Sequence, residues 1–361
     1  MTALVTGGAG YIGSHMALAL LERHEEVVVL DNLSTGVREL VPAGARFVHG
    51  NVGNRSLVSK LIAEHDINCV FHFAGSSVVP DSVADPLRYY ANNTANSRNL
   101  IEACVESRLN HFIFSSTAAV YGDTESASID ETAMKSPINP YGRSKLMIEW
   151  VLQDTAQASD LRYVALRYFN VAGADPLGRT GQSTPRATHL IKRACQTALG
   201  RLPYLGIFGV DFPTPDGTGV RDYIHVSDLV AAHALALDHL RGVGESGAFN
   251  CGYGHGFSVR EVIDAVERAC GRKLPVKELP RRPGDPPAVV ADSAKLKRRL
   301  GWRPRYDALD MIVRDALAWE GRVGQAEMGN STLGQRRRRG FPQGVADQDR
   351  TASPMVSTST P

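Results

Sequence analysis

Two side chains that could carry out acid/base chemistry together are Tyr141 and Lys145. They stand four residues apart, so on a helix both project from the same face. The preceding Asn139 and Pro140 predict where that helix begins, because Asn is a good N-cap and Pro at the first helical position loses no hydrogen bond. We expect the helix to continue to about Ala158.

A lysine beside a tyrosine favours the phenolate form of the tyrosine. To act as a base near neutral pH, a tyrosine with a pKa of ~10 must be lowered by roughly 3 units, at ~1.36 kcal/mol per unit. One cation at ~4 Å supplies about 4 kcal/mol at an effective dielectric constant near 20. Tyr141 is therefore a candidate base. Because this spacing often arises by chance, the hypothesis depends on whether the rest of the chain builds a site around the pair.

The first segment of the chain has the pattern of a dinucleotide site. A predicted strand at residues 3–6 leads into Gly7-Gly8-Ala9-Gly10-Tyr11-Ile12-Gly13, a helix follows, and a second strand at 27–30 ends at Asp31. These glycines allow a tight turn and close approach of the backbone to a pyrophosphate, whose charge is met by the helix N-terminus. An acid at the end of the second strand can bind the ribose hydroxyls and would repel a 2′-phosphate, which favours NAD over NADP.

Strands and helices continue to alternate along the chain. Further strands are predicted at 46–50, 69–74, 111–116 and 163–168, and helices at 56–65, 87–109 and 141–158. This order is typical of an α/β fold with a doubly wound, parallel, Rossmann-type sheet. Ligands bind such sheets at the carboxyl ends of the strands. The residues at or just after these ends, which we expect to share one site, are Gly7, Asp31, Phe73, Ser115, Thr117 and Asn170.

The composition changes after this alternating region. Residues 1–170 are predicted to form the NAD-binding domain, and 171–323 a smaller C-terminal lobe that binds mainly substrate and returns to the sheet near 248–251. Within this lobe, Ser258 and Glu261 predict a capping box at the start of a helix. Arginines in loops at 211–222 and 281–285 suggest phosphate clamps. From 324 to 361 apolar periodicity is lost, which predicts a disordered tail.

The bulk composition excludes several other classes of protein. With 361 residues, 43% of them hydrophobic, the chain can bury a large core, and a net charge of +2 argues against a nucleic-acid-binding protein. The five cysteines are scattered and contain no Cys-x-x-Cys pair, so we expect reduced thiols in a cytoplasmic protein. We expect no metal site, no signal peptide and no membrane span.

Taken together, these segments make the chain resemble the extended short-chain dehydrogenase/reductase family, and within it the sugar-nucleotide epimerases that act on UDP-glucose. The resemblance covers about residues 1–319, and its most specific stretches are 6–14, 31–34, 120–122, 167–170, 216–225 and 282–285. It implies 4-epimerisation between UDP-glucose and UDP-galactose through a 4-keto sugar, with tightly bound NAD. It also implies a homodimer formed through the helices at 87–109 and 141–158.

The resemblance assigns a role to each site residue. Tyr141 would be the catalytic base, Lys145 would bind the nicotinamide ribose and tune Tyr141, and Thr117 would bridge Tyr141 and the sugar hydroxyl. Besides Tyr141 and Lys145, the residues implied around NAD are Gly7, Gly10, Tyr11, Ile12, Gly13, Asp31, Asn32, Ser34, Gly36, Asn51, Val52, Phe73, Ala74, Gly75, Asn92, Ser115, Tyr168 and Phe169. Besides Thr117, those implied around the UDP-sugar are Asn170, His189, Leu190, Phe208, Arg221, Arg282, Asp285 and Val289.

Four positions depart from the family pattern. Asn51 replaces an adenine-binding Asp, Ser77 replaces a Lys near the pyrophosphate, and His189 stands where Asn is common. Val289 aligns with a gate residue that limits the substituent on sugar C2, and a Tyr at this gate excludes N-acetyl sugars in some relatives. UDP-N-acetylhexosamines therefore remain alternative substrates, together with the pentoses of UDP-xylose and UDP-arabinose and with UDP-glucuronate.

Two other activities fit these residues less well. The sugar dehydratases of the family need an acid pair after the position of Thr117, where this chain has Ala118 and Ala119, so dehydration is disfavoured. A non-catalytic NAD-sensing regulator would keep the fold, but such proteins typically lose the Tyr or the Lys, and this chain has both.

Overall fold

The computed structural model describes residues 1–123, 128–184, 187–282 and 285–338, with side chains described as far as residue 323. Residues Met1–Gly321 form one compact unit, and Arg322–Pro361 form a second. Pro185, Arg186, Pro283 and Gly284, which fall in predicted substrate segments, lie outside the described residues, as does the tail from 339 to 361.

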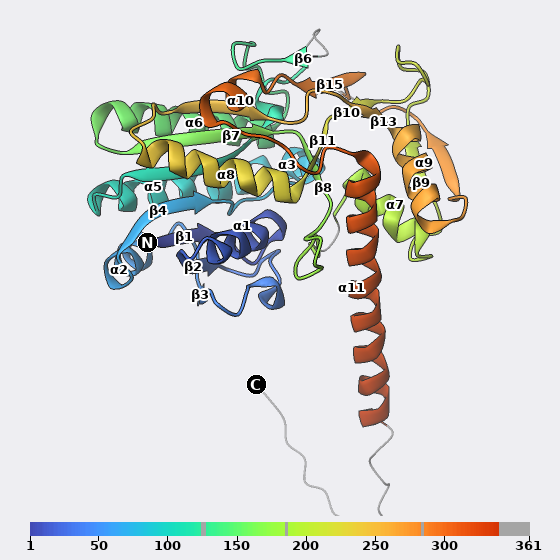
Figure 1. Ribbon diagram of the computed structural model, residues 1–361, viewed down its shortest axis with the longest axis horizontal. Helices are drawn as coiled ribbons and strands as arrows, with labels where there is room; N and C mark the ends of the chain where they lie inside the picture. Colours follow the sequence, from blue (N-terminus) through green and yellow to red (C-terminus); the bar gives the residue numbers. More distant parts are fainter. Residues whose placement is uncertain (124–127, 185–186, 283–284, 339–361) are drawn as a thin grey trace, which may run out of the picture. The chain divides into compact units, whose positions relative to one another are not determined.

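A seven-stranded sheet lies at the centre of the first unit, and every pairing between its neighbouring strands is parallel. The strand order is β12-β7-β5-β4-β1-β2-β3. In Figure 1, β3, β2, β1, β4 and β7 follow one another from bottom to top. The seven strands are β1 (Thr2–Thr6), β2 (Glu26–Asp31), β3 (Arg46–His49), β4 (Ile67–His72), β5 (His111–Thr117), β7 (Arg162–Tyr168) and β12 (Gly247–Cys251). The prediction of a parallel, doubly wound sheet is confirmed.

Helices cover both faces of this sheet. The connections between the strands contain α1 (Tyr11–Glu22), α2 (Arg55–Glu64), α5 (Asn96–Glu106), α6 (Pro140–Ala158) and α8 (Val226–Arg241). Side chains alternate between the faces, so Val5 and Val29 pack in one core with Met16 of α1 and Leu229 of α8. The neighbouring Leu4, Val28 and Leu30 pack in the other core, with Leu61 of α2, Leu100 of α5 and Leu152 of α6. Because the strands are buried on both faces, their sequences are nearly continuous runs of apolar residues.

The strand order reverses between β1 and β4, and the two strand ends approach closely there. Gly7 has φ +70°, and a Cβ at this position would lie 2.6 Å from the backbone nitrogen of Ala74. Only glycine tolerates both that conformation and that contact. Such a switch point is where open α/β sheets bind nucleotides.

The remainder of the first unit consists of short sheets and helices. The strands β6 (Ser128–Ile129), β10 (Val220–Arg221), β13 (Phe257–Ser258) and β15 (Ala288–Ala291) form a four-stranded sheet. Two-stranded sheets pair β8 (Asn170–Ala172) with β11 (Tyr223–His225), and β9 (Leu205–Phe208) with β14 (Val276–Leu279). The other helices are α3 (Val79–Ala84), α4 (Pro86–Tyr89), α7 (Leu190–Ala198), α9 (Val259–Cys270), α10 (Ala294–Leu300) and α11 (Leu309–Arg338), with 3₁₀ turns η1 (Arg38–Leu40) and η3 (Ala118–Val120).

Three features differ from the sequence-based expectations. The helix predicted at 87–109 is instead divided into α4, a π-helical segment η2 (Tyr90–Ala95) and α5. Within η2, the side chains of Asn92 and Asn93 donate hydrogen bonds to Ser76. The first unit does not divide near 170, since β12 returns to pair with β7, at the segment where we expected a return to the sheet. Helix α11 continues to Arg338, beyond 324, where we expected order to end.

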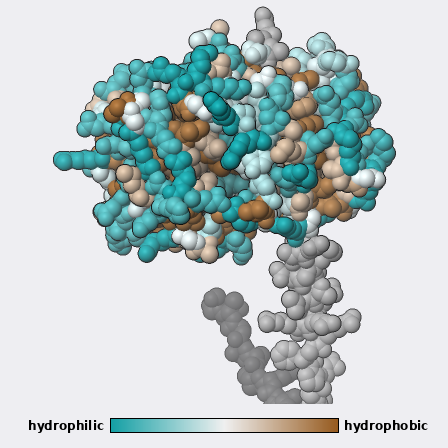
Figure 2. Space-filling model, viewed as in Figure 1, coloured by the Kyte–Doolittle hydropathy of each residue, from teal (hydrophilic) through white to brown (hydrophobic). Residues whose placement is uncertain are grey.

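Hydrophilic side chains cover most of the face of the first unit seen in Figure 2, and the apolar residues on it are scattered. None of the helices within the described ranges is both long and apolar enough to cross a membrane.

Candidate active site

The glycine-rich turn between β1 and α1 leaves its backbone open to an anion. Gly10 is the N-cap of α1 and has no side chain to cap the first N–H groups. A Cβ at Gly13 would lie 2.2 Å from the carbonyl oxygen of Gly7, so the helix packs against the turn only because residue 13 is glycine. The first turn of α1 contains no acidic residue. Free N–H groups at a helix N-terminus fit a pyrophosphate.

Asp31 links the glycine-rich turn to the loop that follows β2. Its carboxylate accepts hydrogen bonds from the backbone N–H of Ala9, at 3.0 Å, and of Leu33, at 2.8 Å. A carboxylate can accept about four hydrogen bonds, so lone pairs remain for ribose hydroxyls. A Cβ at Gly36 would lie 2.9 Å from Asp31 Oδ1, and Asn32 Oδ1 accepts from the Ser34 N–H at 3.0 Å. These contacts shape the loop that follows β2.

Lys145 extends from α6 to the end of β5. The helix begins at Pro140, as predicted, with the Asn139 side chain accepting from the Gly142 N–H at 2.9 Å. Lys145 is buried, and its Nζ donates to the carbonyl oxygen of Ser115 at 2.9 Å. Burial lowers the pKa of Lys145 to about 8. Its ammonium also lies 5.0 Å from the ring centroid of Phe114.

Tyr141 and Thr117 interact through their hydroxyl groups. Burial raises the pKa of Tyr141, and a hydrogen bond with the Thr117 side chain opposes that rise. Thr117 is the last residue of β5, and its Oγ1 also accepts from the Ala119 N–H at 3.2 Å. The structure thus brings together the three residues that we predicted to be catalytic. For Tyr141 to act as a base, additional positive charge must offset the effect of burial on its pKa.

The remaining residues that we predicted around NAD lie at the carboxyl ends of β1 to β5 and β7 or on the segments that follow them. Phe73, Ala74 and Gly75 follow β4, and Asn92 lies in η2. Ser115 lies in β5, two residues before its end, Tyr168 is the last residue of β7, and Phe169 follows it. The Ser115 and Tyr168 hydroxyls are hydrogen-bonded to each other. Two side chains are engaged elsewhere: the Tyr11 hydroxyl donates to Gly173 O at 2.7 Å, and Asn51 Oδ1 accepts from the Gly53 N–H at 2.7 Å.

Sequence reasoning missed two groups near these residues. His233 of α8 is fully buried, with its ring 4.9 Å from that of Phe73 and 6.3 Å from that of Tyr168. Asn93 bonds to both the N–H and the carbonyl of Ser76 and to the Ser144 hydroxyl of α6. Neither residue has a sequence signal beyond its type, because both contacts join segments that are far apart in the chain.

The residues that we predicted around the UDP-sugar form two groups. Asn170, His189 and Leu190 line one cavity with Tyr223 and Gln182, and His189 bonds to Gln182 at 2.8 Å. In the second group, the Arg282 guanidinium lies 3.7 Å from the ring centroid of Phe208. Arg221 forms an ion pair with Asp285, and Val289 pairs with Arg221 between β15 and β10.

These two groups are joined through the backbone. The Asn170 N–H donates to the Asp222 carbonyl at 3.0 Å, next to Arg221. Asn170 is two residues beyond Tyr168, the last residue of β7. Among the described residues, no group of three His, Cys, Asp or Glu side chains could hold a metal ion.

The fold and this set of side chains define a class of protein: a Rossmann-type enzyme with a Tyr/Lys pair at the carboxyl edge of the sheet. The chain matches the model of the NAD dependent epimerase/dehydratase family over residues 3–252. It is 57% identical to a UDP-glucose 4-epimerase of Azospirillum brasilense over 317 residues, which cover 88% of this chain and 91% of that protein.

Solved structures agree with this relationship. The crystal structure of a UDP-glucose 4-epimerase from Brucella ovis in complex with NAD is 45% identical, with a TM-score of 0.86 over 88% of this chain and 98% of that one. A UDP-glucose 4-epimerase from Bifidobacterium longum in complex with NAD+ and UDP is 37% identical, with a TM-score of 0.84 over 89% of this chain and 98% of that one. The chain therefore belongs to the NAD dependent epimerase/dehydratase family. Its cofactor is NAD.

Proposed function

We propose that this enzyme interconverts UDP-glucose and UDP-galactose through a 4-keto sugar, with Tyr141 as the base. One arrangement carries the proposal: Tyr141 and Lys145 project from one face of α6, and both are linked to β5, Tyr141 through Thr117 and Lys145 through Ser115. The glycine-rich turn follows β1, two strands away in the same parallel sheet. The names of its relatives support the same reaction.

The dinucleotide fits residues of this chain. The glycine-rich turn offers free N–H groups, and Asp31 retains lone pairs for ribose hydroxyls. When bound, NAD supplies a reversible hydride acceptor. Its positively charged ring would also offset the effect of burial on the pKa of Tyr141. We propose that the enzyme retains NAD between turnovers.

Tyr141 then acts on the sugar 4-hydroxyl. Its phenolate takes the proton from O4 as C4 is oxidised, and its hydroxyl returns the proton when C4 is reduced from the other face. The Thr117 hydroxyl, already bonded to Tyr141, positions the sugar hydroxyl. Lys145 holds positive charge close to this position, because its Nζ is fixed at the end of β5.

The nucleotide part of the substrate has its own binding groups. Arg221 carries the charge to hold a diphosphate, and the stacked pair of Arg282 and Phe208 offers flat faces to a base. These contacts do not depend on the configuration at C4, so both sugars can bind while the hexose is free to turn.

The proposal is tested by assaying the purified chain for conversion of UDP-galactose to UDP-glucose without added NAD. Turnover, with release of dinucleotide on denaturation, is the expected result. Absence of turnover both with and without added NAD would contradict it. Comparing UDP-xylose, UDP-arabinose and UDP-glucuronate in the same assay would identify the preferred sugar. Conversion that requires added NAD would show that the enzyme releases NAD between turnovers instead of retaining it.

A broader substrate range is a second proposal, favoured by Val289. This small side chain packs against the cluster that contains Phe169 and Leu146, as does the partly buried Ala118. A valine leaves more room than a tyrosine would for a C2 substituent. Conversion of UDP-N-acetylglucosamine by the wild type, and its selective loss in Val289→Tyr, would support this range.

We also propose a homodimer and a cytoplasmic location. Val83 of α3, Leu87 of α4 and Trp150 of α6 are 63%, 79% and 51% exposed, and α3 and α4 both pack against α6. Covering such apolar side chains would favour association of two copies. Sedimentation of the wild type as a dimer and of Trp150→Asp as a monomer is expected, whereas a monomeric wild type at micromolar concentration would contradict the proposal.

A further inference from the structure

A buried polar network lies under the catalytic helix, and the proposed mechanism does not use it. Its centre is the ion pair of Glu149 on α6 with Arg167 on β7, whose side chains are 7% and 5% exposed. The Arg167 guanidinium donates to the Glu149 carboxylate through Nε, at 3.0 Å, and through Nη2, at 2.5 Å. A two-point contact of this kind fixes both distance and orientation.

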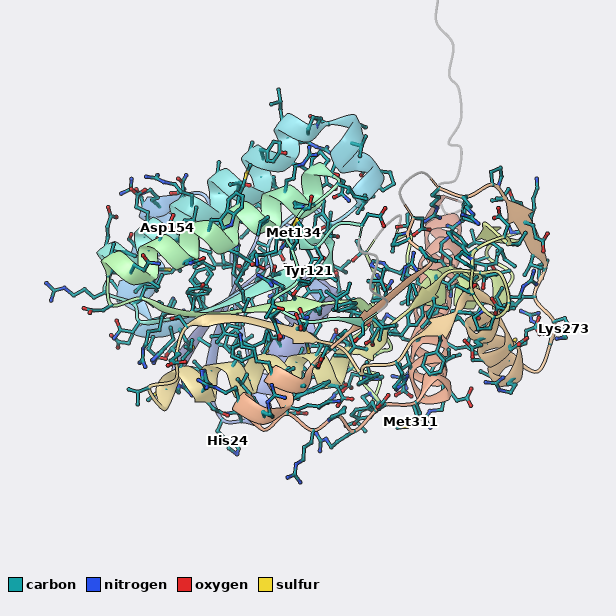
Figure 3. The ribbon with its side chains drawn as sticks, turned by 90° about the horizontal axis from the view of Figure 1, so that it is seen from above. His24, Tyr121, Met134, Asp154, Lys273 and Met311 are labelled. Atoms are coloured by element: carbon teal, nitrogen blue, oxygen red, sulfur yellow. The ribbon has the colours of Figure 1, made fainter. Side chains whose placement is uncertain are left out.

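The network continues from this pair into two further strands. The Ser116 hydroxyl of β5 donates to Glu149 Oε1. On the other side, Arg167 Nη1 donates to the Tyr121 hydroxyl at 2.9 Å, and that hydroxyl donates to Asn250 Oδ1 of β12 at 2.7 Å. Figure 3 shows Tyr121 in the interior of the first unit, near its centre in this view. The network therefore connects α6 with β5, β7 and β12.

Three members of the network, Glu149, Ser116 and Arg167, are adjacent to residues of the proposed site. Tyr141, Lys145 and Glu149 are successive positions on one face of α6, because they are four residues apart. Ser116 and Arg167 are register partners between β5 and β7. Ser116 lies between Ser115, which accepts from Lys145, and Thr117, which bonds to Tyr141, while Arg167 precedes Tyr168.

The two faces of the strands separate the network from the site. Phe112, Phe114 and Ala165 belong to the core beneath α6, and Ser116 and Arg167 continue the same alternation. Ser115 and Tyr168 fall on the opposite face, where their hydroxyls bond to each other. The network therefore fixes the position and rotation of α6 relative to the ends of β5 and β7, which also carry residues of the proposed site.

We infer that Glu149 and Arg167 are positioning residues that set the register of the Tyr141/Lys145 helix against the ends of β5 and β7. This inference rests on the proposed function. Packing alone does not require the pair, because well-packed apolar residues replace a buried ion pair at little or no cost in stability. What an apolar pair lacks is a directional link to Ser116 and to Tyr121. Loss of that link displaces α6, and a displacement of ~1 Å in an active site can cost about a hundredfold in rate.

The inference is tested with Glu149→Gln and with the double variant Glu149→Leu/Arg167→Leu. In Glu149→Gln we expect bound NAD to be retained, KM for the UDP-sugar to stay within about threefold, and kcat to fall about tenfold or more. The double variant is the critical measurement, because it removes the buried charges together. We expect the melting temperature of the double variant to lie close to that of the wild type, while its kcat stays as low as that of Glu149→Gln.

Glu106→Gln is the matched control, since it removes an exposed Glu–Arg pair from the neighbouring helix α5; its kcat should equal that of the wild type. A folded double variant with wild-type kcat would overturn the inference, because the pair would then serve stability alone. A double variant that does not fold would also overturn it, because a positioning pair should be replaceable in the core. If the wild type converts no UDP-galactose to UDP-glucose in the same assay, the proposed function itself fails, and the two failures are thereby distinguished.

Discussion

Lys145 Nζ donates a hydrogen bond to the carbonyl oxygen of Ser115 at 2.9 Å, so its buried ammonium links helix α6 to β5, two residues before the end of that strand. Burying an ammonium against a neutral carbonyl is costly to the fold, and the lowered pKa of Lys145 reflects that cost. The arrangement makes sense where positive charge is needed for chemistry.

The first prediction concerns the stability of Lys145→Met. The pKa of Lys145 is about 8 in the folded chain, against an ordinary value of 10.5, so between these pH values the unfolded chain binds more protons. Through this window Lys145 makes the free energy of unfolding rise with pH, and below it the buried charge costs about 3 kcal/mol. Lys145→Met should therefore be more stable than the wild type at pH 7, by up to that amount, and inactive.

Urea denaturation of both proteins without substrate, at pH 7 and pH 10, measures this difference. The difference in the free energy of unfolding between Lys145→Met and the wild type should be smaller at pH 10 than at pH 7. Lys60→Met is the control, because Lys60 is 66% exposed, and it should show no such gap. A Lys145→Met variant that is less stable than the wild type at both pH values would contradict the prediction.

The second prediction concerns Thr117→Val, which removes the hydroxyl while keeping the shape. The hydrogen bond from Thr117 lowers the pKa of Tyr141, so its loss should shift the acid limb of the kcat profile to higher pH. A hydrogen bond to a charged group contributes about 1.5–3 kcal/mol, so kcat should fall about tenfold to a hundredfold. Thr132→Val, on an exposed loop, should behave as the wild type in the same pH series.

The third prediction concerns the glycine-rich turn. In Gly13→Ala, the new Cβ would lie 2.2 Å from the Gly7 carbonyl oxygen, which is backbone and cannot move aside without displacing the turn. The purified variant should contain little or no NAD, as measured by the dinucleotide released on denaturation. Gly247→Ala is the matched control, because its Cβ meets nothing within 4 Å. Equal NAD content in both variants would show that the turn tolerates the methyl group.

The sequence predicted the parts of this fold that depend on local pattern. The apolar strands, the glycine turn and the Asn139-Pro140 start of α6 are set by neighbouring residues, and the structure has all three. The roles assigned to the individual site residues stay predictions, although the structure brings Tyr141, Lys145 and Thr117 together at β5.

Contacts between distant segments could not be predicted in the same way. Tyr121 and Asn250 are 129 residues apart, and only the return of β12 to the sheet brings them within 2.7 Å. The bond from Asn93, in the π-helical segment η2, to Ser76 is likewise not revealed by any periodicity in 87–109. Such contacts depend on tertiary packing, for which single-sequence patterns carry no signal.

The fourth prediction concerns the base. Tyr141→Phe keeps the ring and removes the proton acceptor, so kcat should fall by about a hundredfold or more while binding of the UDP-sugar and NAD is retained. Tyr204→Phe, a surface substitution at a side chain that is 42% exposed, is the control. Near-normal turnover in Tyr141→Phe would remove Tyr141 from the mechanism.

The most direct test of the central claim uses UDP-galactose that carries deuterium at C4 of the sugar. If the hydride leaves C4 and returns to the same carbon within one closed site, while Tyr141 handles only the proton on O4, the UDP-glucose formed in ordinary water should retain deuterium at C4. Product in which C4 carries hydrogen from the solvent would contradict the account.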